Sequence, residues 1–198
     1  MHHWSLSSTK DEIGNATLFD GFSVNLVSNR YGIPFRSTEF KNGCLLIPRG
    51  LYIEESFSLS AWVNLKVNKL YSVLVSFAND NEMIWIGFKG LSLHVEIKSG
   101  SNNGFVKMTS NLFLKKDVWT HITFVLKDSI GYIYFNGSEI NKGSLTRPNS
   151  VETIFNFIGQ DYYNSSLYLA EAIYEELKIY RGALTEVEVK NEFNNECK

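Results

Sequence analysis

Apolar and polar residues alternate along much of this sequence, and this period of two constrains the fold more than any other feature. In FSLSAWVNL, residues 57–65, every second residue is apolar, starting from Phe57. In THITFVLK, residues 120–127, the apolar Ile122, Phe124 and Leu126 share one face. Such alternation is typical of a strand with one buried face. Clusters of Asn, Gly, Asp and Ser separate these segments, and the spacing predicts an all-β sandwich or barrel.

The residues of one turn specify a hairpin. The segment GYIYFNG ends in Asn136-Gly137, and both residue types tolerate the positive φ that a two-residue type I′ turn requires. We therefore expect SEINKG, residues 138–143, to return as the paired strand. No internal repeat, low-complexity segment or linker interrupts the pattern, so we expect a single domain over residues 1–198.

Only the segment LTEVEVKNEF, residues 184–193, is typical of a helix. Thr185 is followed three residues later by Glu188, which is the spacing of a capping box. Leu184, Val187 and Phe193 fall roughly on one side of this helix. The sequence thus predicts one short C-terminal helix after the strand AIYEELKIY.

Charge and hydropathy exclude two classes of partner. The 19 Lys and Arg residues nearly balance the 21 Asp and Glu residues, and no basic run suits a phosphate backbone, so we expect no nucleic-acid partner. No apolar stretch approaches the roughly 20 residues of a membrane helix, so we expect no membrane insertion. The start, MHHWSLSSTK, has no signal-peptide character, which suggests a domain excised from a longer precursor.

Three Asn-X-Ser/Thr triplets and two cysteines bear on the compartment. The triplets begin at Asn15, Asn136 and Asn164, and each accepts a glycan only in the secretory pathway, so they favour an extracellular or cell-surface ectodomain. Cys44 and Cys197 lie far apart in the sequence, and neither belongs to a C-x-x-C motif or has a histidine beside it. This excludes a zinc site built on cysteine pairs. They form either a disulfide or two free thiols.

The run Asn79-Asp80-Asn81-Glu82 places four oxygen-bearing side chains in a row between two apolar segments. Asn and Asp are good turn formers, because their side chains bond to their own backbone. The same oxygens are ligands that Ca²⁺ prefers. A polar turn and a calcium loop therefore both explain the run.

Four longer segments follow one another as FSLSAWVNL, DVWTHITFVLKDSIGYIYFNGSEI, FNFIGQD and YEELKIYRGALTEVEV. Their order and spacing resemble those of laminin-G-like and pentraxin-like domains, which belong to the concanavalin A-like lectin and glucanase group. The resemblance covers essentially the whole chain, including HHWSL at its start. It implies an antiparallel jelly-roll sandwich of two sheets with one short C-terminal helix.

The resemblance also selects calcium ligands. In pentraxins an Asp-Asn-Glu run carries Asp and Asn ligands, and Asp80-Asn81-Glu82 matches it. A further acidic ligand follows a Gly-Gln pair in a later loop, where this chain has Asp161. The resemblance thus implies a calcium site of Asp80, Asn81 and Asp161. The next acidic ligand of pentraxins is replaced by Tyr163, which does not serve an ordinary Ca²⁺ site.

The cysteines depart from the pentraxin pattern. Ser60 and Thr123 stand where pentraxins join two neighbouring strands by a disulfide, so neither phosphocholine binding nor a five-membered ring is implied. In this fold the first and last strands run beside each other. We therefore expect Cys44 and Cys197 to come within the reach of a disulfide.

The sequence lacks the motifs of the common catalytic sites. Glycosidases of this fold carry paired carboxylates on one strand, and no E-x-D-x-x-E motif occurs here. The four histidines are scattered, and there is no G-x-S-x-G elbow, Walker loop or H-E-x-x-H motif. We therefore expect no enzymatic activity. Among the functions that this sequence suggests, glycoside hydrolysis ranks third, behind two binding functions.

We expect an extracellular recognition module that binds carbohydrate at a rim of loops together with calcium. The loops at 79–82 and 161–166 would meet at this rim, where Trp85, Tyr162 and Tyr163 stack on a sugar ring. The alternative is a protein–protein adhesion module of a larger cell-surface or matrix protein. That module needs neither a metal nor a sugar pocket.

Overall fold

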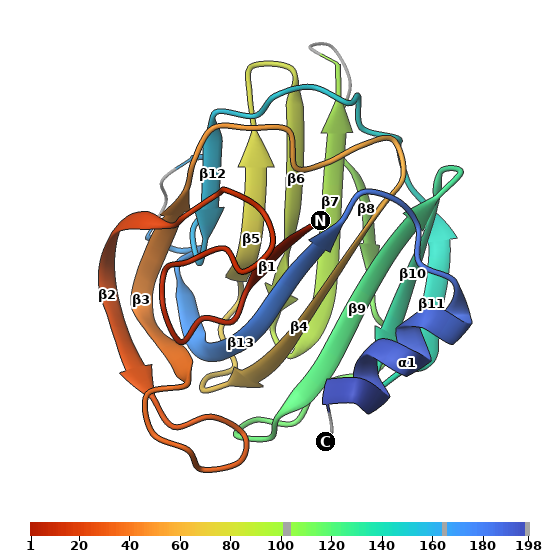
Figure 1. The fold of residues 1–198 in the computed structure, drawn as a ribbon. Coiled ribbons are helices and arrows are strands. Elements are labelled where there is room, and N and C mark those ends of the chain that lie inside the picture. Colours follow the sequence, from red (N-terminus) through yellow and green to blue (C-terminus); the bar gives the residue numbers. More distant parts are fainter. Residues whose placement is uncertain (101–103, 164–165, 197–198) are drawn as a thin grey trace.

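The structure is a computed structural model, which describes residues 1–100, 104–163 and 166–196. Asn164 and Cys197 lie outside the described residues. The strands are β1 (His2–Trp4), β2 (Phe19–Val27), β3 (Ser37–Ile47), β4 (Phe57–Leu65), β5 (Ser72–Ala78), β6 (Glu82–Lys89), β7 (Ser92–Ser99), β8 (Val106–Thr109), β9 (Thr120–Lys127), β10 (Ile130–Phe135), β11 (Ser138–Ser144), β12 (Phe155–Ile158) and β13 (Ala170–Tyr180). The helix α1 (Glu186–Glu196) follows β13 (Figure 1).

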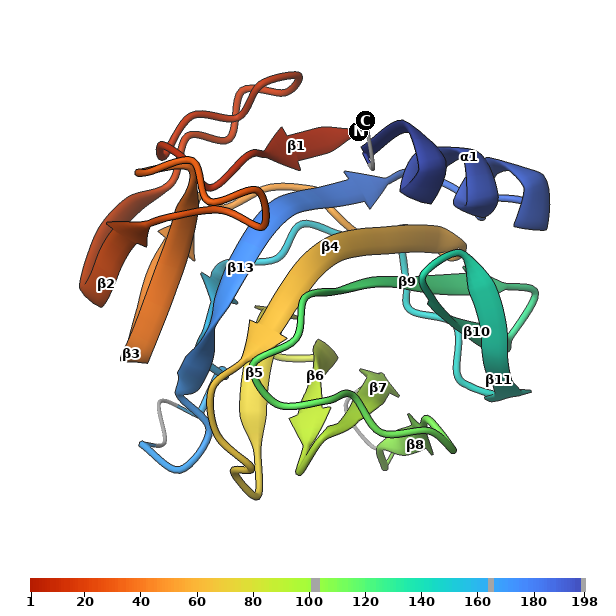
Figure 2. The same ribbon diagram turned by 90° about the horizontal axis from the view of Figure 1, so that it is seen from below.

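The described elements are strands apart from α1, which confirms the all-β prediction. Paired strands run antiparallel to each other. Hydrogen bonds connect them in the order β11-β10-β9-β4-β13-β3-β12-β5-β6-β7-β8, with β1 beside β13 and β2 beside β3. We expected two sheets, but this path is continuous, because β12 pairs with β3 on one side and with β5 on the other. Figure 2 shows β4 and β9 in one layer, with β5 to β8 in a layer below them.

The core contains the residues that the alternation predicts. Phe57 and Leu59 of β4 are fully buried, as are Ile122 and Phe124 of β9. The two strands pair so that Leu59 lies opposite Phe124, which places both apolar faces on the same side of the sheet. The period of two therefore identifies the core-facing side chains of these strands correctly.

The other face of β4 and β9 is also buried, which the alternation does not predict. The ring of Trp62 lies 5.2 Å from that of His121 and 5.8 Å from that of Phe193 in α1. The guanidinium of Arg30, from the loop between β2 and β3, lies 4.5 Å from the centre of the Trp62 ring. The helix and this loop thus cover a face that would otherwise contact solvent.

The predicted hairpin is confirmed. Asn136 and Gly137 have φ values of 49° and 75°, and Phe135 pairs with Ser138 across the two-residue turn. A second such turn joins β9 to β10 at Asp128-Ser129, where both residues also have positive φ. The sequence did not reveal this second turn, because neither of its residues is glycine.

The capping box of α1 is confirmed, but the expected apolar side of the helix is wrong at Val187. The backbone NH of Thr185 donates to Glu188 Oε2 at 2.7 Å, and the NH of Glu188 donates back to Thr185 Oγ1 at 3.3 Å. Val187 is 66% exposed, whereas Val189 is fully buried. Residues four apart share a helix face, so the buried side runs through Val189 and Phe193 rather than Val187.

Two further expectations concern cysteine and the membrane. Cys44 is buried and forms no disulfide with any residue that the structure describes, and burial raises the pKa of its thiol to about 11. Because Cys197 lies outside the described residues, its pairing with Cys44 stays a prediction.

Among the described residues, no helix has the length and apolar character that crossing a membrane requires.

Candidate functional site

The polar run between β5 and β6 divides into structural and exposed side chains. Asn79 Oδ1 accepts hydrogen bonds from the backbone NH groups of Asn81 and Glu82, at 2.9 and 2.8 Å. Its Nδ2 donates to the carbonyl of Glu152 at 3.0 Å. The side chain of Asn79 thus shapes the turn by bonding to the turn's backbone, as turn-forming residues do. Asp80 and Asn81 remain exposed.

Glu82 is a buried structural carboxylate, with only 3% of its surface exposed. Its Oε1 accepts hydrogen bonds from Ser99 Oγ at 3.2 Å, from the NH of Gly100 at 3.1 Å and from Asn149 Nδ2 at 2.7 Å. Its Oε2 accepts from the NH of Asn149 at 3.1 Å. Both oxygens are therefore occupied in joining β6 to the end of β7 and to the segment before β12.

An aromatic cavity of about 220 Å³ lies on the sheet face that points away from the core. Strand pairing places Trp85 of β6 opposite Glu96 of β7, and Glu96 opposite Lys107 of β8. The loop between β12 and β13, the residue before β5 and the residue before β8 complete the walls. The lining residues are Tyr71, Met83, Trp85, Glu96, Phe105, Lys107, Asp161, Tyr163 and Tyr168.

Contacts between aromatic rings give the cavity a rigid floor. The Tyr71 ring lies 5.0 Å from that of Tyr168 and 6.3 Å, edge on, from that of Trp85. Trp85 is only 4% exposed, so it forms the floor rather than an open platform. Gly87 leaves room for it, because a Cβ there would stand 2.7 Å from the indole. Tyr163, which is 62% exposed, is the accessible ring at the rim.

Charged groups on the cavity wall are held in place by neighbouring side chains. Glu96 Oε1 is hydrogen-bonded to His94 Nε2 and to Lys107 Nζ, each at 2.9 Å. Burial acts to raise the pKa of Glu96, but the hydrogen bonds from His94 and Lys107 outweigh it and lower that pKa below its usual value. Asp161 lines the same cavity and is 2% exposed. Aromatic walls with a few fixed polar groups are typical of small-ligand sites.

The structure brings together three of the residues that the sequence selected, namely Trp85, Asp161 and Tyr163. Tyr162 lies beside them, with its ring 4.9 Å from that of Phe155 and 5.4 Å from that of Tyr163. Tyr71, Phe105 and Tyr168 were missed, because loops distant in sequence bring them to the site. The outward positions of Glu96 and Lys107 could have been found from alternation, since both follow the period of two.

The predicted calcium ligands do not share one cavity. Asp80 and Asn81 line a small neighbouring cavity with Tyr162 and Tyr163, whereas Asp161 lines the aromatic cavity. Within the described ranges, no three His, Cys, Asp or Glu side chains are grouped so that they could hold a metal ion. Calcium binding through Asp80, Asn81 and Asp161 therefore stays a prediction.

Comparisons with known proteins identify the fold. A family model described as the concanavalin A-like lectin/glucanases superfamily matches residues 41–190. Domain 4 of AbnA, an extracellular arabinanase from Geobacillus stearothermophilus solved in complex with arabinotriose, is similar with a TM-score of 0.72 and 19% identity, covering 96% of each chain. A search of curated protein sequences finds no match.

Two toxin domains show the same fold. The binding domain of Paraclostridial Mosquitocidal Protein 1 has a TM-score of 0.74 and 19% identity over 98% of this chain. A structure of botulinum neurotoxin type C, whose cell entry depends on two ganglioside molecules, has a TM-score of 0.68 and 14% identity over 95% of this chain. The present chain spans about half the length of these toxin chains, 51% and 50% respectively.

Proposed function

The chain belongs to the concanavalin A-like lectin/glucanases superfamily, and on that premise we propose that it is a non-catalytic carbohydrate-binding module. The observation that carries this proposal is the aromatic cavity, in which rings and charged side chains line one space. Apolar sugar faces stack on aromatic rings, and sugar hydroxyls bond to fixed polar groups. The similar arabinanase domain was solved with arabinotriose, and the similar neurotoxin interacts with gangliosides.

Each part of the cavity has a role in this proposal. Tyr163 is the accessible ring on which a sugar face stacks, and Trp85 closes the floor beneath it. Asp161 and Glu96 accept hydrogen bonds from sugar hydroxyls, while Lys107 donates them. The cavity of about 220 Å³ suits one or two sugar units rather than a long chain in an extended groove.

Replacing Tyr163 by alanine is expected to weaken glycan binding by about tenfold, because the accessible stacking surface is lost while the buried floor stays. A glycan array identifies the ligand, and calorimetry with that glycan measures the loss. The matched control is Phe113→Ala, since Phe113 is 74% exposed and does not line the cavity. An array without any bound glycan would instead favour the protein–protein adhesion module, and equal affinity for both variants would place the site elsewhere.

We also propose, from the resemblance of Asp80-Asn81-Glu82 and of Asp161 to the calcium loops of pentraxins, that the module binds calcium through Asp80, Asn81 and Asp161. Calcium at a hundredfold excess over its dissociation constant should then stabilise the fold by about 2.7 kcal/mol, which raises the melting temperature by a few degrees. Asp80→Ala should abolish this shift, whereas Glu139→Ala, an exposed carboxylate on β11, should keep it. A wild-type melting curve that chelator leaves unchanged would show that the turn at 79–82 binds no calcium.

The extracellular or cell-surface location is likewise a proposal, and it rests on the glycan acceptors. Asn15 is exposed. Asn136 is exposed too, but its Oδ1 accepts a hydrogen bond from the NH of His121 at 3.0 Å, and the adjacent Gly137 lies against Phe193. In a secreted protein we therefore propose fuller glycosylation at Asn15 and Asn164 than at Asn136.

A further inference from the structure

The loop between β2 and β3, residues 28–36, holds three large apolar side chains out in solvent. Tyr31 is 51% exposed, Ile33 is 50% exposed and Phe35 is 68% exposed. Pro34 between them is exposed as well. Exposed apolar side chains that are grouped on one loop mark a surface that contacts a partner. We call residues 31–35 the apolar tip.

The apolar tip is rigid because a network of hydrogen bonds closes it. Asn29 Oδ1 accepts from the NH groups of Tyr31 and Ile33, at 3.0 and 2.9 Å. The NH of Asn29 donates to the carbonyl of Ile33 at 3.0 Å. Phe35 has a φ of 59°, a conformation that is strained for a bulky residue and that is common at functional sites. These hydrogen bonds hold the backbone of residues 29–33 in a closed turn from which the apolar side chains project.

A buried ion pair anchors the base of this loop to the sheet. The guanidinium of Arg30 pairs with the carboxylate of Glu175 in β13. Glu175 Oε2 also accepts from the NH of Arg30 at 3.3 Å and from Ser37 Oγ at 2.8 Å. The guanidinium lies over the rings of Trp62 and Tyr31, at 4.5 and 4.6 Å. These contacts attach the base of the loop to β13 and β4.

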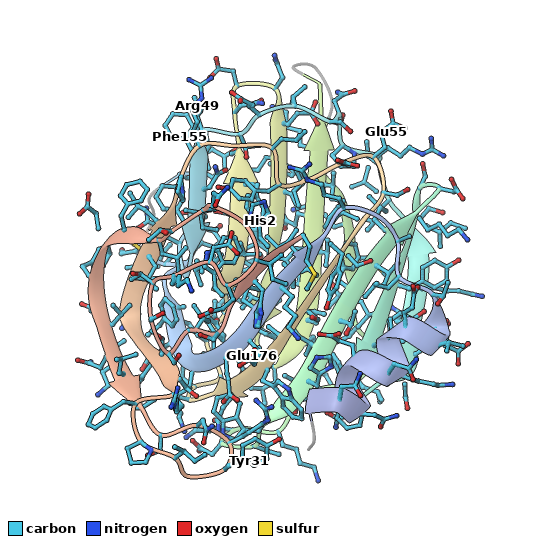
Figure 3. The ribbon with its side chains drawn as sticks, viewed as in Figure 1. His2, Tyr31, Arg49, Glu55, Phe155 and Glu176 are labelled. Atoms are coloured by element: carbon cyan, nitrogen blue, oxygen red, sulfur yellow. The ribbon has the colours of Figure 1, made fainter. Side chains whose placement is uncertain are left out.

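Unpaired basic residues and a second apolar loop lie near the same end of the molecule. In Figure 1 the segment between β8 and β9 reaches the same lower end as the loop after β2, and Figure 3 places Tyr31 there, opposite Arg49 and Phe155. On that segment Leu112 and Phe113 are 53% and 74% exposed. Arg36 and Lys115 are exposed, and neither forms an ion pair with any residue that the structure describes.

We propose that this end of the protein docks on a lipid surface that bears anionic headgroups, with the apolar tip seated among the headgroups. A protruding tip with aromatic and aliphatic side chains suits the soft interface of a bilayer. Arg36, next to the apolar tip, and Lys115, on the segment between β8 and β9, complement anionic headgroups. This is peripheral binding, so it requires no segment that crosses the membrane. It concerns a surface separate from the aromatic cavity, and it holds whether or not the cavity binds sugar.

The test is co-sedimentation of the protein with vesicles of phosphatidylcholine, with and without phosphatidylserine, and without any glycolipid. The wild type should bind the vesicles that contain phosphatidylserine, and high salt should weaken that binding. The double variant Ile33→Ser/Phe35→Ser should bind at least about tenfold more weakly, because it loses two inserted apolar side chains. Arg36→Gln should weaken binding to the anionic vesicles only.

The matched control is Val187→Ser, because Val187 is an equally exposed apolar residue on α1, away from the tip. Its vesicle binding should equal that of the wild type. These substitutions change exposed side chains, so circular dichroism and melting curves should stay those of the folded wild type. Absence of wild-type binding to both kinds of vesicle would overturn the proposal. Equal binding by the double variant would overturn it too, and would leave a protein groove as the partner of the tip.

Discussion

Replacing Glu175 by alanine is expected to lower the free energy of unfolding by about 3–5 kcal/mol, the largest loss we predict for a single substitution. The carboxylate is 2% exposed, and it compensates the charge of Arg30, whose side chain is 10% exposed. Its removal takes away the carboxylate that pairs with the buried guanidinium, and it leaves Ser37 Oγ without its acceptor. The cost therefore comes mainly from the lost pairing of a buried charge.

Urea unfolding followed by tryptophan fluorescence measures this loss. The matched control is Glu171→Ala on the same strand, because among the described residues the Glu171 carboxylate accepts only a long hydrogen bond of 3.5 Å, from Asn42 Nδ2. A double variant, Arg30→Met/Glu175→Leu, should recover much of the stability, since it removes both charges together. A loss below about 1 kcal/mol for Glu175→Ala would show that the pair behaves as a surface salt bridge.

Replacing Glu82 by alanine is expected to cost about 3 kcal/mol, whereas Asp80→Ala should change stability by less than about 0.5 kcal/mol without added calcium. The two carboxylates are two residues apart, yet only Glu82 is buried and accepts four hydrogen bonds. Its loss removes the carboxylate oxygens to which the backbone NH groups of Gly100 and Asn149 donate. Hydrogen exchange should therefore increase around residue 149 in the Glu82 variant.

Chemical unfolding of both variants in the presence of chelator separates the two roles. Glu82→Gln serves as the conservative control, because an amide keeps one carbonyl acceptor and should retain part of the stability. Equal losses for Asp80→Ala and Glu82→Ala would contradict the division between a structural and an exposed carboxylate. It would also show that Asp80 has a partner in the folded protein other than calcium.

The candidate site could be predicted from the sequence only in part. Trp85, Asp161 and Tyr163 were selected from the sequence, and the structure places them around one cavity. Tyr71 and Tyr168 complete its wall, although they are almost a hundred residues apart in the chain and their rings lie 5.0 Å apart. No local pattern marks such a contact, because the path of the intervening strands produces it.

The features that the sequence by itself determined all depend on neighbours in the chain. Alternation placed Phe57 and Phe124 in the core, and Asn136-Gly137 formed its turn, because strand period and turn conformation are local properties. Only the tertiary structure decided that β12 joins the two layers, that Val189 rather than Val187 is buried, and that Glu82 is structural while Asp80 is exposed. Burial and hydrogen-bond partners come from segments far away in the sequence. Two valines or two carboxylates that lie two residues apart therefore acquire different roles only when the fold supplies their surroundings.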